Sequence, residues 1–444
     1  MKKKISALLS LCFALSSLPA LTSCGESETV LRIASWEEYI DEGGDDSYIE
    51  GCDSMIEDFE KWYEEKYDEK IKVVYVPLSD NEQMYAKIDK FNRHYDLLCP
   101  SEYMFIKLAN ENRLEQYPDE FFDTENPDNY YAKNVTPFIK NTFENNEIKG
   151  VKWSKYAAGY MWGTTGFIYN TEKVNADDVK SWNVYFNPKY SISAKNNVRD
   201  SYFAGLGMYY ENELLQMRSS VTEETLPAYQ TALSSMMNDT SVQAMNKVES
   251  LLKKMKSTSN FWGFETDNAK SYLISGDIDI SYQWSGDAVY IMDEAESEDL
   301  SHPIRFDYCV PEASSNLWFD GWVMMKNANV KAAIAFVNFV SMPENVIRNM
   351  YYIGYTSCVG GEEVFDYVSE TYSAEDDDED VIEYDLSEYF GEGYFITAST
   401  EQLTRQLYAQ YPDKETLNRC CVMQYFEADV NKRANKLWKN VSGA

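Results

Sequence analysis

The stretch VLRIASW at residues 30–36 alternates apolar and other side chains and is rich in branched residues, so it predicts a β-strand. The segment SMIEDFEKWYEEKY at 54–67 has apolar residues at helical spacing, and IKVVYVP at 71–77 again predicts a strand. A helix is predicted over 82–91, and Ser101 begins the next one. Because strands that alternate with helices form parallel βαβ units, the sequence predicts an α/β fold.

The same alternation continues along the rest of the chain. Further strands are predicted over 95–99, 162–169, 278–284, 304–310 and 317–325, and further helices over 199–210, 242–256, 267–275 and 330–340. Pro343 is expected in the first turn of one more helix, where proline is tolerated. Residues 375–380 are six consecutive acids, which favour a solvent-exposed loop.

Length, charge and motifs restrict the function. The 444 residues are enough for two or three domains of roughly 150 residues each. The net charge of -34 disfavours a nucleic-acid partner, because phosphates would be repelled, whereas cationic ligands are attracted. Only two histidines occur, His94 and His302, so a histidine-rich metal site or a catalytic triad is not expected. The usual nucleotide-binding, zinc-protease, hydrolase and EF-hand motifs are missing from the sequence, and no cofactor is predicted.

The N-terminus has the features of an export signal. Three lysines precede an apolar stretch over 5–21, which is short for a membrane-spanning helix. The sequence LTSC at 21–24 resembles the bacterial lipobox, in which cleavage leaves a cysteine that carries lipid. We therefore expect a signal peptide over 1–23 and a lipidated tether over 24–29 that begins at Cys24.

Six more cysteines follow Cys24, and their spacing matches no zinc pattern. They are Cys52, Cys99, Cys309, Cys358, Cys420 and Cys421. Export permits oxidation, but a large core does not need disulfides, so we expect at most one bridge and no metal site.

Aromatic residues stand next to carboxylates at the ends of several predicted strands. The clusters are Ser35-Trp36-Glu37-Glu38-Tyr39, Ser101-Glu102-Tyr103, Trp284-Ser285-Gly286-Asp287 and Trp318-Phe319-Asp320. Ligands of open α/β sheets bind beyond the carboxyl ends of the strands. Aromatic faces attract cations, and carboxylates make strong hydrogen bonds to ammonium groups. These clusters favour an aliphatic amine whose charges are spaced along a flexible chain.

The residues also carry a family resemblance. The matching stretches are ASWEEY at 34–39, MYAK at 84–87, YDLLCPS at 95–101, YMWGTTG at 160–166, VKSW at 179–182, WSG at 284–286, WFD at 318–320 and IGY at 353–355. In these stretches, and in their order, the chain resembles the bacterial spermidine/putrescine-binding proteins of ABC importers. The resemblance covers nearly the whole mature chain.

The resemblance implies a two-lobed periplasmic-binding-protein fold of type II, with the ligand cleft between the lobes. Lobe 1 would span 30–157, with 317–370 returning to it, and lobe 2 would span 158–316, with 371–444 packing on it. A monomeric, non-enzymatic protein is implied, exported and held at the outer face of the cytoplasmic membrane or in the periplasm. Its partners would be a polyamine, the membrane through its lipid, and an ABC permease.

The resemblance also assigns roles to individual residues. The methylene chain would be sandwiched between the rings of Trp36, Tyr39, Trp284 and Trp318. Further walls and hydrogen bonds would come from Ser101, Tyr103 and Tyr355. The acidic binding positions of the family are matched by Glu38, Asp200, Asp287 and Asp320. Two positions depart from the family, since Glu37 stands where Ser or Thr is usual and Asn197 where Asp is frequent. A C-terminal polar contact falls near Met423 or Gln424, and insertions near 41–52 and 372–398 lie outside the pattern.

Asp320 follows Trp318 by two residues on a predicted strand, so both side chains should share a face. Asp287 is expected to hold the opposite ammonium of a diamine, and Asp200 a third one. This slightly favours putrescine over spermidine. Two alternatives stay open: a sugar or peptide receptor of the same fold, and an exported glycoside hydrolase that uses an acidic pair.

Overall fold

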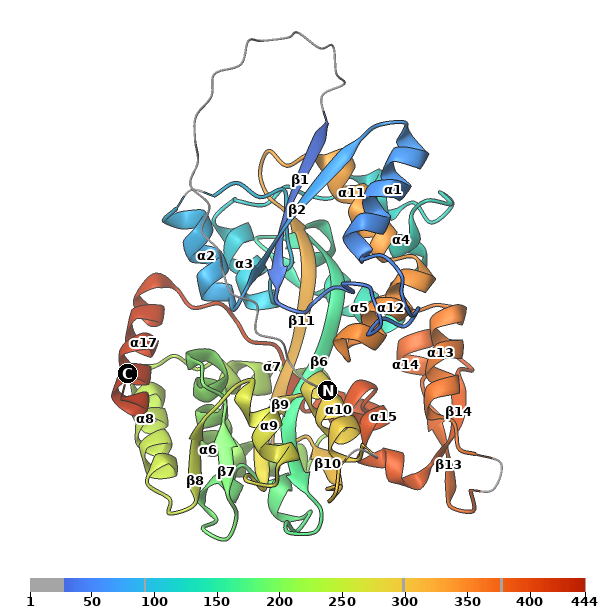
Figure 1. The fold of residues 1–444 in the computed structure, drawn as a ribbon. Helices are drawn as coiled ribbons and strands as arrows, with labels where there is room; N and C mark the ends of the chain where they lie inside the picture. Colours follow the sequence, from blue (N-terminus) through green and yellow to red (C-terminus); the bar gives the residue numbers. More distant parts are fainter. Residues whose placement is uncertain (1–27, 92, 298–299, 376–377, 444) are drawn as a thin grey trace, which may run out of the picture.

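The computed structural model describes residues 28–91, 93–297, 300–375 and 378–443 (Figure 1). The expected signal peptide, the lipidation site Cys24 and most of the tether therefore lie outside the described residues. Within those ranges all six cysteines are free, and no group of three or more His, Cys, Asp or Glu side chains is placed to hold a metal ion. The acids of the run at 375–380 that the structure describes are exposed, as predicted.

The N-terminal half begins with parallel βαβ units, as predicted, and also contains the antiparallel pair β4–β5. Its elements are β1 (Thr29–Trp36), α1 (Met55–Tyr67), β2 (Ile71–Leu78), α2 (Asn81–Asp89), β3 (Leu97–Leu98), α3 (Glu102–Asn110), α4 (Tyr130–Asn134), α5 (Pro137–Asn145), β4 (Glu147–Ile148) and β5 (Val151–Lys152). β1 pairs in parallel with β2 on one side and with β3 on the other. Ser54 begins α1 through a reciprocal capping box with Glu57, which satisfies two backbone donors at the helix end.

Two long strands, β6 (Ala157–Asn170) and β11 (Ser315–Met324), run the length of the molecule (Figure 1). The sheet order is β2-β1-β3-β11-β6-β9-β7-β8, and β11 is antiparallel to both β3 and β6. The expectation of a parallel arrangement is therefore wrong for these strands. The reason is that β6 leads from the N-terminal half into the second half and β11 returns, so β11 is antiparallel to β6 and β3.

The second half repeats the alternation around β9. Its elements are β7 (Ile192–Ala194), α6 (Val198–Arg218), α7 (Leu226–Met237), α8 (Val242–Lys256), β8 (Phe261–Phe264), α9 (Asn268–Ile274), β9 (Ile280–Trp284), α10 (Ser285–Ala295) and β10 (Phe306–Cys309). β7 is parallel to β8 and β9, so the carboxyl ends of these three strands face the same way.

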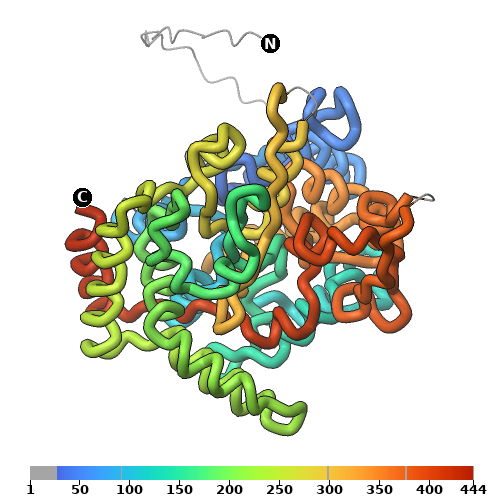
Figure 2. Tube along the Cα trace, turned by 90° about the horizontal axis from the view of Figure 1, so that it is seen from below, coloured from blue at the N-terminus to red at the C-terminus, as the bar shows by residue number. Residues whose placement is uncertain are grey.

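The C-terminal part contacts both halves. Its elements are α11 (Val330–Val340), α12 (Pro343–Ile353), β12 (Thr356–Ser357), α13 (Glu362–Tyr372), β13 (Val381–Asp385), α14 (Ser387–Phe390), β14 (Phe395–Ser399), α15 (Gln406–Gln410), α16 (Lys414–Asn418), β15 (Cys420–Cys421) and α17 (Ala428–Ser442). The insertion near 372–398 forms the β13–β14 hairpin with α14, and α14 packs on α5. By contrast α15 packs on α10, and α17 lies along α8 (Figure 2).

Buried apolar residues form two clusters, which is what a two-lobed molecule requires. One surrounds β1, β3, α3, α11 and the first part of β6, and it also reaches α10. The other lies between β7, α6, α8 and α17. The lobe boundaries given above stay predictions.

No single described helix has the length and apolar character needed to cross a membrane. Only α11 and α12 together pass that criterion, and they are bent by 74° relative to each other.

Arg348 of α12 fixes the insertion near 41–52 to the lobe. Its Nε donates to Asp41 Oδ2 at 2.7 Å, and its Nη1 donates to Asp58 Oδ2 at 2.8 Å. Its Nη2 donates to the carbonyl of Asp53 at 2.8 Å and lies 3.2 Å from Cys52 Sγ. Arg348 is 5% exposed and Asp41 is fully buried, so this ion pair is inaccessible to water.

We predict that Arg348→Met lowers the free energy of unfolding by about 3 kcal/mol or more, because it leaves the Asp41 carboxylate buried without its cation. Urea denaturation followed by tryptophan fluorescence measures the change. The matched control is Lys61→Met, which removes an exposed partner of Asp53 and should leave the transition nearly unchanged. Equal transitions for the two variants would contradict the assignment.

Candidate ligand-binding site

Asp320 of β11 presents one unoccupied carboxylate oxygen. The side chain is 4% exposed, and its Oδ2 accepts hydrogen bonds from Trp36 Nε1 and from the Tyr39 hydroxyl, both at 2.8 Å. Its Oδ1 is buried and has no hydrogen-bond partner among the described residues. Burial raises the pKa of Asp320 to about 6, while the neighbouring polar side chains of Ser101, Trp36 and Tyr39 act to lower it. A buried acceptor in this state is suited to a cationic donor.

The chain turns sharply to bring these groups together. Trp36 ends β1, and Glu38 in the following turn has a φ of 52°, a left-handed conformation that precedes the inward-facing Tyr39. The register of β11 shifts at Asp320, where the backbone bridges to Ser101 at the start of α3. The ends of β1 and β3 therefore meet the middle of β11.

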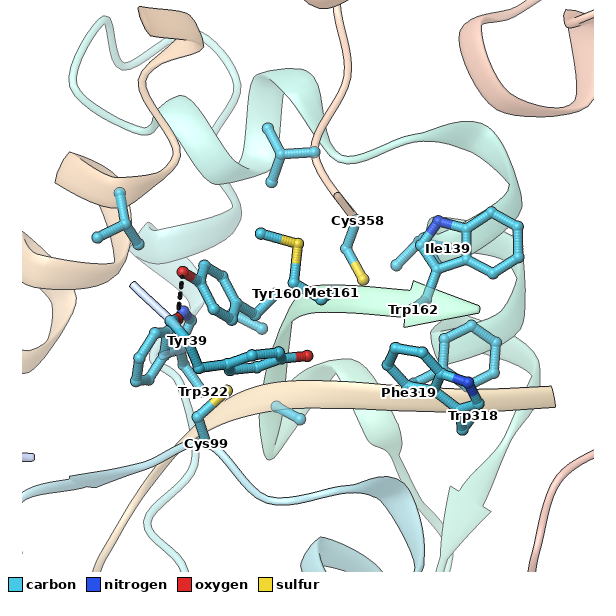
Figure 3. Close-up of a cluster of buried hydrophobic side chains, with 14 of the residues drawn as sticks. Tyr39, Cys99, Ile139, Tyr160, Met161, Trp162, Trp318, Phe319, Trp322 and Cys358 are labelled. Carbon is cyan, nitrogen blue, oxygen red and sulfur yellow. Dashed lines mark hydrogen bonds between the residues drawn. The ribbon is translucent and has the colours of Figure 1, made fainter. Parts of the chain in front are cut away.

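Aromatic rings form the walls beside Asp320. The Trp318 and Tyr355 rings lie 5.3 Å apart between centroids, and Tyr39 and Tyr355 lie 6.0 Å apart. Figure 3 shows Tyr39 and Trp318 among the buried side chains around β6 and β11. The Tyr160 hydroxyl donates to the backbone carbonyl of Tyr39 at 3.0 Å. The predicted meeting of Trp36, Tyr39, Trp318, Asp320 and Tyr355 is thus observed.

Two glycines allow the rings to approach the backbone. A Cβ on Gly163 of β6 would lie 2.8 Å from Cζ2 of Trp318, and a Cβ on Gly286 of α10 would lie 1.3 Å from Cδ1 of Tyr355. Any side chain at these positions would displace the rings. The glycines of the motif stretches around 160–166 and 284–286 therefore position the walls formed by Trp318 and Tyr355.

The second carboxylate, Asp287, already has cationic partners in the chain. Lys195 Nζ lies 3.5 Å from its Oδ2, Lys270 Nζ lies 3.5 Å from its Oδ1, and the Tyr355 hydroxyl donates to Oδ1 at 3.2 Å. Lys195 Nζ also lies 3.2 Å from the ring centroid of Trp284. The structure thus places Trp284 and Asp287 together, as expected, but with an ammonium group of the protein between them.

Lys195 was not singled out by the sequence. It follows β7, which is parallel to β9, and Trp284 ends β9, so the two side chains emerge at the same edge of the sheet. The short β7 shows no strong alternation of apolar and polar residues, so the sequence did not predict it as a strand. The position of Lys195 at the sheet edge therefore could not be inferred. Burial lowers the pKa of Lys195, while Asp287 and Asp200 oppose this shift.

Asp200 and Asn197 lie at the start of α6. Asn197 caps the helix by accepting from the backbone of Asp200 at 2.7 Å, and its amide donates to Asp200 Oδ2 at 2.5 Å. Burial raises the pKa of Asp200, and Lys195 is the largest opposing influence. Asn197 therefore acts on Asp200 as a helix cap and as a hydrogen-bond donor.

Arg199 connects α6 to the opposite half. Its guanidinium carbon lies 4.3 Å from the ring centroid of Tyr103 and 3.7 Å from that of Phe426, within range of a cation–π contact. Its Nη2 donates to the carbonyl of Gln424, so Gln424 lies next to α6, and the expected C-terminal contact to a ligand stays a prediction. Met423 is buried in the second hydrophobic cluster.

The remaining predicted residues lie at the margin. Glu37 and Glu38 are exposed in the turn after β1, whereas Ser101 accepts from Asn81 at 3.0 Å. The sequence assigned no role to Glu102, which stands between Ser101 and Tyr103, yet the side chain is fully buried behind Asp320. Its Oε2 accepts from the backbone of Phe319 at 3.0 Å, and burial raises its pKa to about 8. Glu102 is therefore largely uncharged at neutral pH and leaves Asp320 as the anionic group at this end.

A comparison with known proteins identifies the family. Residues 54–361 match the family model of the bacterial extracellular solute-binding proteins. The chain belongs to this family. Several curated relatives of this solute-binding protein are named for the amines they bind.

Two such relatives cover most of the chain. The spermidine/putrescine-binding periplasmic protein of Salmonella typhimurium is 23% identical over 329 residues, which is 73% of this chain and 76% of that protein. The putrescine-binding periplasmic protein SpuD of Pseudomonas aeruginosa is 25% identical over 350 residues, or 78% of this chain and 82% of that protein.

Solved structures confirm the two-lobed fold. A putative spermidine/putrescine ABC transporter protein from Listeria monocytogenes superposes with a TM-score of 0.63 at 22% identity, covering 93% of this chain and 99% of its own. The substrate-binding protein PotD from Streptococcus pneumoniae gives a TM-score of 0.60 at 22% identity, covering 94% of this chain and 99% of its own.

We predict that Gly286→Ala destabilises this solute-binding protein by about 1–3 kcal/mol, because the new methyl group collides with Tyr355. Helix propensity alone would give the opposite sign, by up to about 1 kcal/mol. Urea denaturation of Gly286→Ala in the wild-type background and in a Tyr355→Ala background separates the two effects. The substitution should become neutral or stabilising once the ring is gone, and an unchanged cost would show that Tyr355 is not the obstacle.

Proposed function

We propose that this protein is the extracytoplasmic substrate-binding component of an ABC importer for polyamines, putrescine and/or spermidine, and that it catalyses no reaction. The observation that carries the proposal is the unpartnered, buried Oδ1 of Asp320 among the rings of Trp36, Tyr39 and Trp318. The names of the curated relatives support the same ligand class.

An aliphatic ammonium group fits this environment. It would donate to Asp320 Oδ1 in a region of low dielectric, while the neighbouring aromatic faces stabilise its charge and cover its methylene chain. Tyr355 extends from Asp320 toward Asp287, since its ring contacts Tyr39 and its hydroxyl contacts Asp287. The chain of the ligand would follow this ring, with Trp284, Ser101, Tyr103, Asp200 and Asn197 around its path, and we expect micromolar affinity or better, about -8 kcal/mol.

Export and anchoring complete the proposal. The mature protein would be attached to the outer face of the cytoplasmic membrane through lipid on Cys24, and it would deliver the ligand as a monomer to its permease. The family description, extracellular solute binding, is consistent with this location.

The alternative functions fit the site less well. A sugar or a neutral peptide segment would leave Asp320 Oδ1 facing neutral hydroxyl or amide groups, although its buried charge favours a cation. A glycoside hydrolase needs an accessible carboxylic acid of raised pKa. Burial raises the pKa of both Glu102 and Asp320, but the two side chains are only 0% and 4% exposed. The Glu102 Oε2 also accepts from the backbone of Phe319.

We predict that Asp320→Asn weakens the binding of any amine ligand by at least roughly thirtyfold, because loss of one partner of a buried charge pair costs about 2–5 kcal/mol. Isothermal titration calorimetry with putrescine and spermidine measures the effect. Asp307→Asn on β10 removes the same charge far from the site and should bind normally. Normal binding by Asp320→Asn would place the ligand elsewhere.

Binding should also depend on pH in a defined direction. The ligand needs the ionised carboxylate, and burial raises the pKa of Asp320 to about 6, so protonation competes with the ligand below that pH. Glu102, with a pKa of about 8, stays protonated throughout the range used here. We predict that affinity falls roughly tenfold from pH 7 to pH 5, with proton release on binding at pH 5 in calorimetry. An affinity that rises on acidification would contradict the role of Asp320.

A further inference from the structure

The two ends of the candidate site differ in charge. At one end Asp320 is ionised at neutral pH and has a free oxygen, while Glu102 behind it is held protonated by burial. At the other end Asp287 stands between Lys195 and Lys270, at 3.5 Å from each ammonium nitrogen. Among the described residues no cationic side chain is ion-paired with Asp320. At the second end Lys195 and Lys270 already interact with the acids of that region, which are Asp287, Asp200 and Asp267.

Lys195 is built into the second end rather than loosely attached to its surface. The side chain has no exposed area, and its ammonium lies 3.2 Å from the ring centroid of Trp284. The Ser201 hydroxyl donates to its backbone carbonyl at 2.6 Å, which ties the residue to α6. Lys195 therefore occupies, with its own ammonium group, the aromatic and acidic surroundings that would suit an ammonium group of the ligand.

A second ligand ammonium at this end would meet like charge. It would compete with Lys195 for the same ring and carboxylate, and Lys270 holds the other oxygen of Asp287. Like charges in a partly buried site repel more strongly than in water. An oxygen acceptor of the ligand would instead be stabilised at this end, because the ammonium groups of Lys195 and Lys270 can donate hydrogen bonds to it.

We infer that Lys195 makes this site selective for amines with one ammonium group, held at Asp320, and an oxygen acceptor at the other end. This rests on the proposed amine-binding function and narrows its ligand class, from putrescine and spermidine to amines that carry a single ammonium group. N-acylated diamines and ω-amino acids share this chemistry. The parent diamine, with ammonium groups at both ends, should bind less well than either.

The ranking of ligands by the unmodified protein is the first test. Calorimetry at pH 7 should show that N-acetylputrescine or 5-aminopentanoate binds at least tenfold more tightly than putrescine. Pentylamine, which has one ammonium group and no acceptor, should bind more weakly than the better of those two. The two acceptor ligands also distinguish an amide from a carboxylate at the far end.

Lys195→Met gives the second test, because it removes the charge and keeps an unbranched apolar stem. The ratio of putrescine affinity to acceptor-ligand affinity should rise at least tenfold in this variant. Lys173→Met, which removes a lysine that is 49% exposed and pairs with Asp279, is the matched control and should leave the ratio unchanged. Lys195→Gln replaces Lys195→Met if thermal melting shows that the latter does not fold.

The outcomes separate the two hypotheses. If putrescine binds most tightly to the unmodified protein, and removal of the Lys195 charge leaves the ratio unchanged, the inference is overturned while the proposed amine-binding function stands. If neither mono- nor diamines bind to the unmodified protein or to the Lys195 variants, the proposed function itself fails, and the inference fails with it.

Discussion

The candidate site depends on one carboxylate that is kept out of water on a strand common to both halves of the molecule. Asp320 lies on β11, and its burial would be unfavourable without the indole and phenol donors that hold one of its oxygens. These donors satisfy only one side of the group. The free oxygen is therefore a directional acceptor, whose position is fixed by the sheet and not by a mobile loop.

The aromatic residues around Asp320 are held by close backbone contacts. Gly163 and Gly286 have no side chain to keep the rings of Trp318 and Tyr355 away, so each ring lies against a strand or a helix end. Rigid walls of this kind reduce the side-chain entropy that a ligand would otherwise have to remove on binding.

Much of the fold could be predicted from local pattern. The bounds of α1, β2 and α11 follow directly from apolar periodicity and from signals such as the Ser54 cap. The direction of β6 and β11 could not be predicted, because strand orientation depends on which half of the molecule the chain enters next. Short elements such as β7 were also missed, since three residues carry too little periodicity to be distinguished from a loop.

The site residues also divide into those that the local sequence predicted and those whose role depends on the fold. Trp36, Tyr39, Trp318 and Asp320 were found because each stands in a cluster of aromatic and acidic residues at a strand end. Lys195 and Glu102 were not assigned roles, because their importance comes from burial and from the neighbours that the fold gives them. Glu37 and Glu38 stand in the same motif as Trp36 and Tyr39 but are exposed in the turn after β1, and their roles stay predictions.

The C-terminal stretch has a mechanical consequence. The Tyr389 ring of α14 stacks on Trp162 at 5.4 Å between centroids, while α15, further along the same stretch, packs on α10. This stretch therefore joins the two halves in addition to β6 and β11. The stacked rings belong to the first hydrophobic cluster together with α5, so a relative motion of the two halves would have to be taken up by the chain between α14 and α15. The extension therefore adds a covalent link between the halves that does not pass through the sheet.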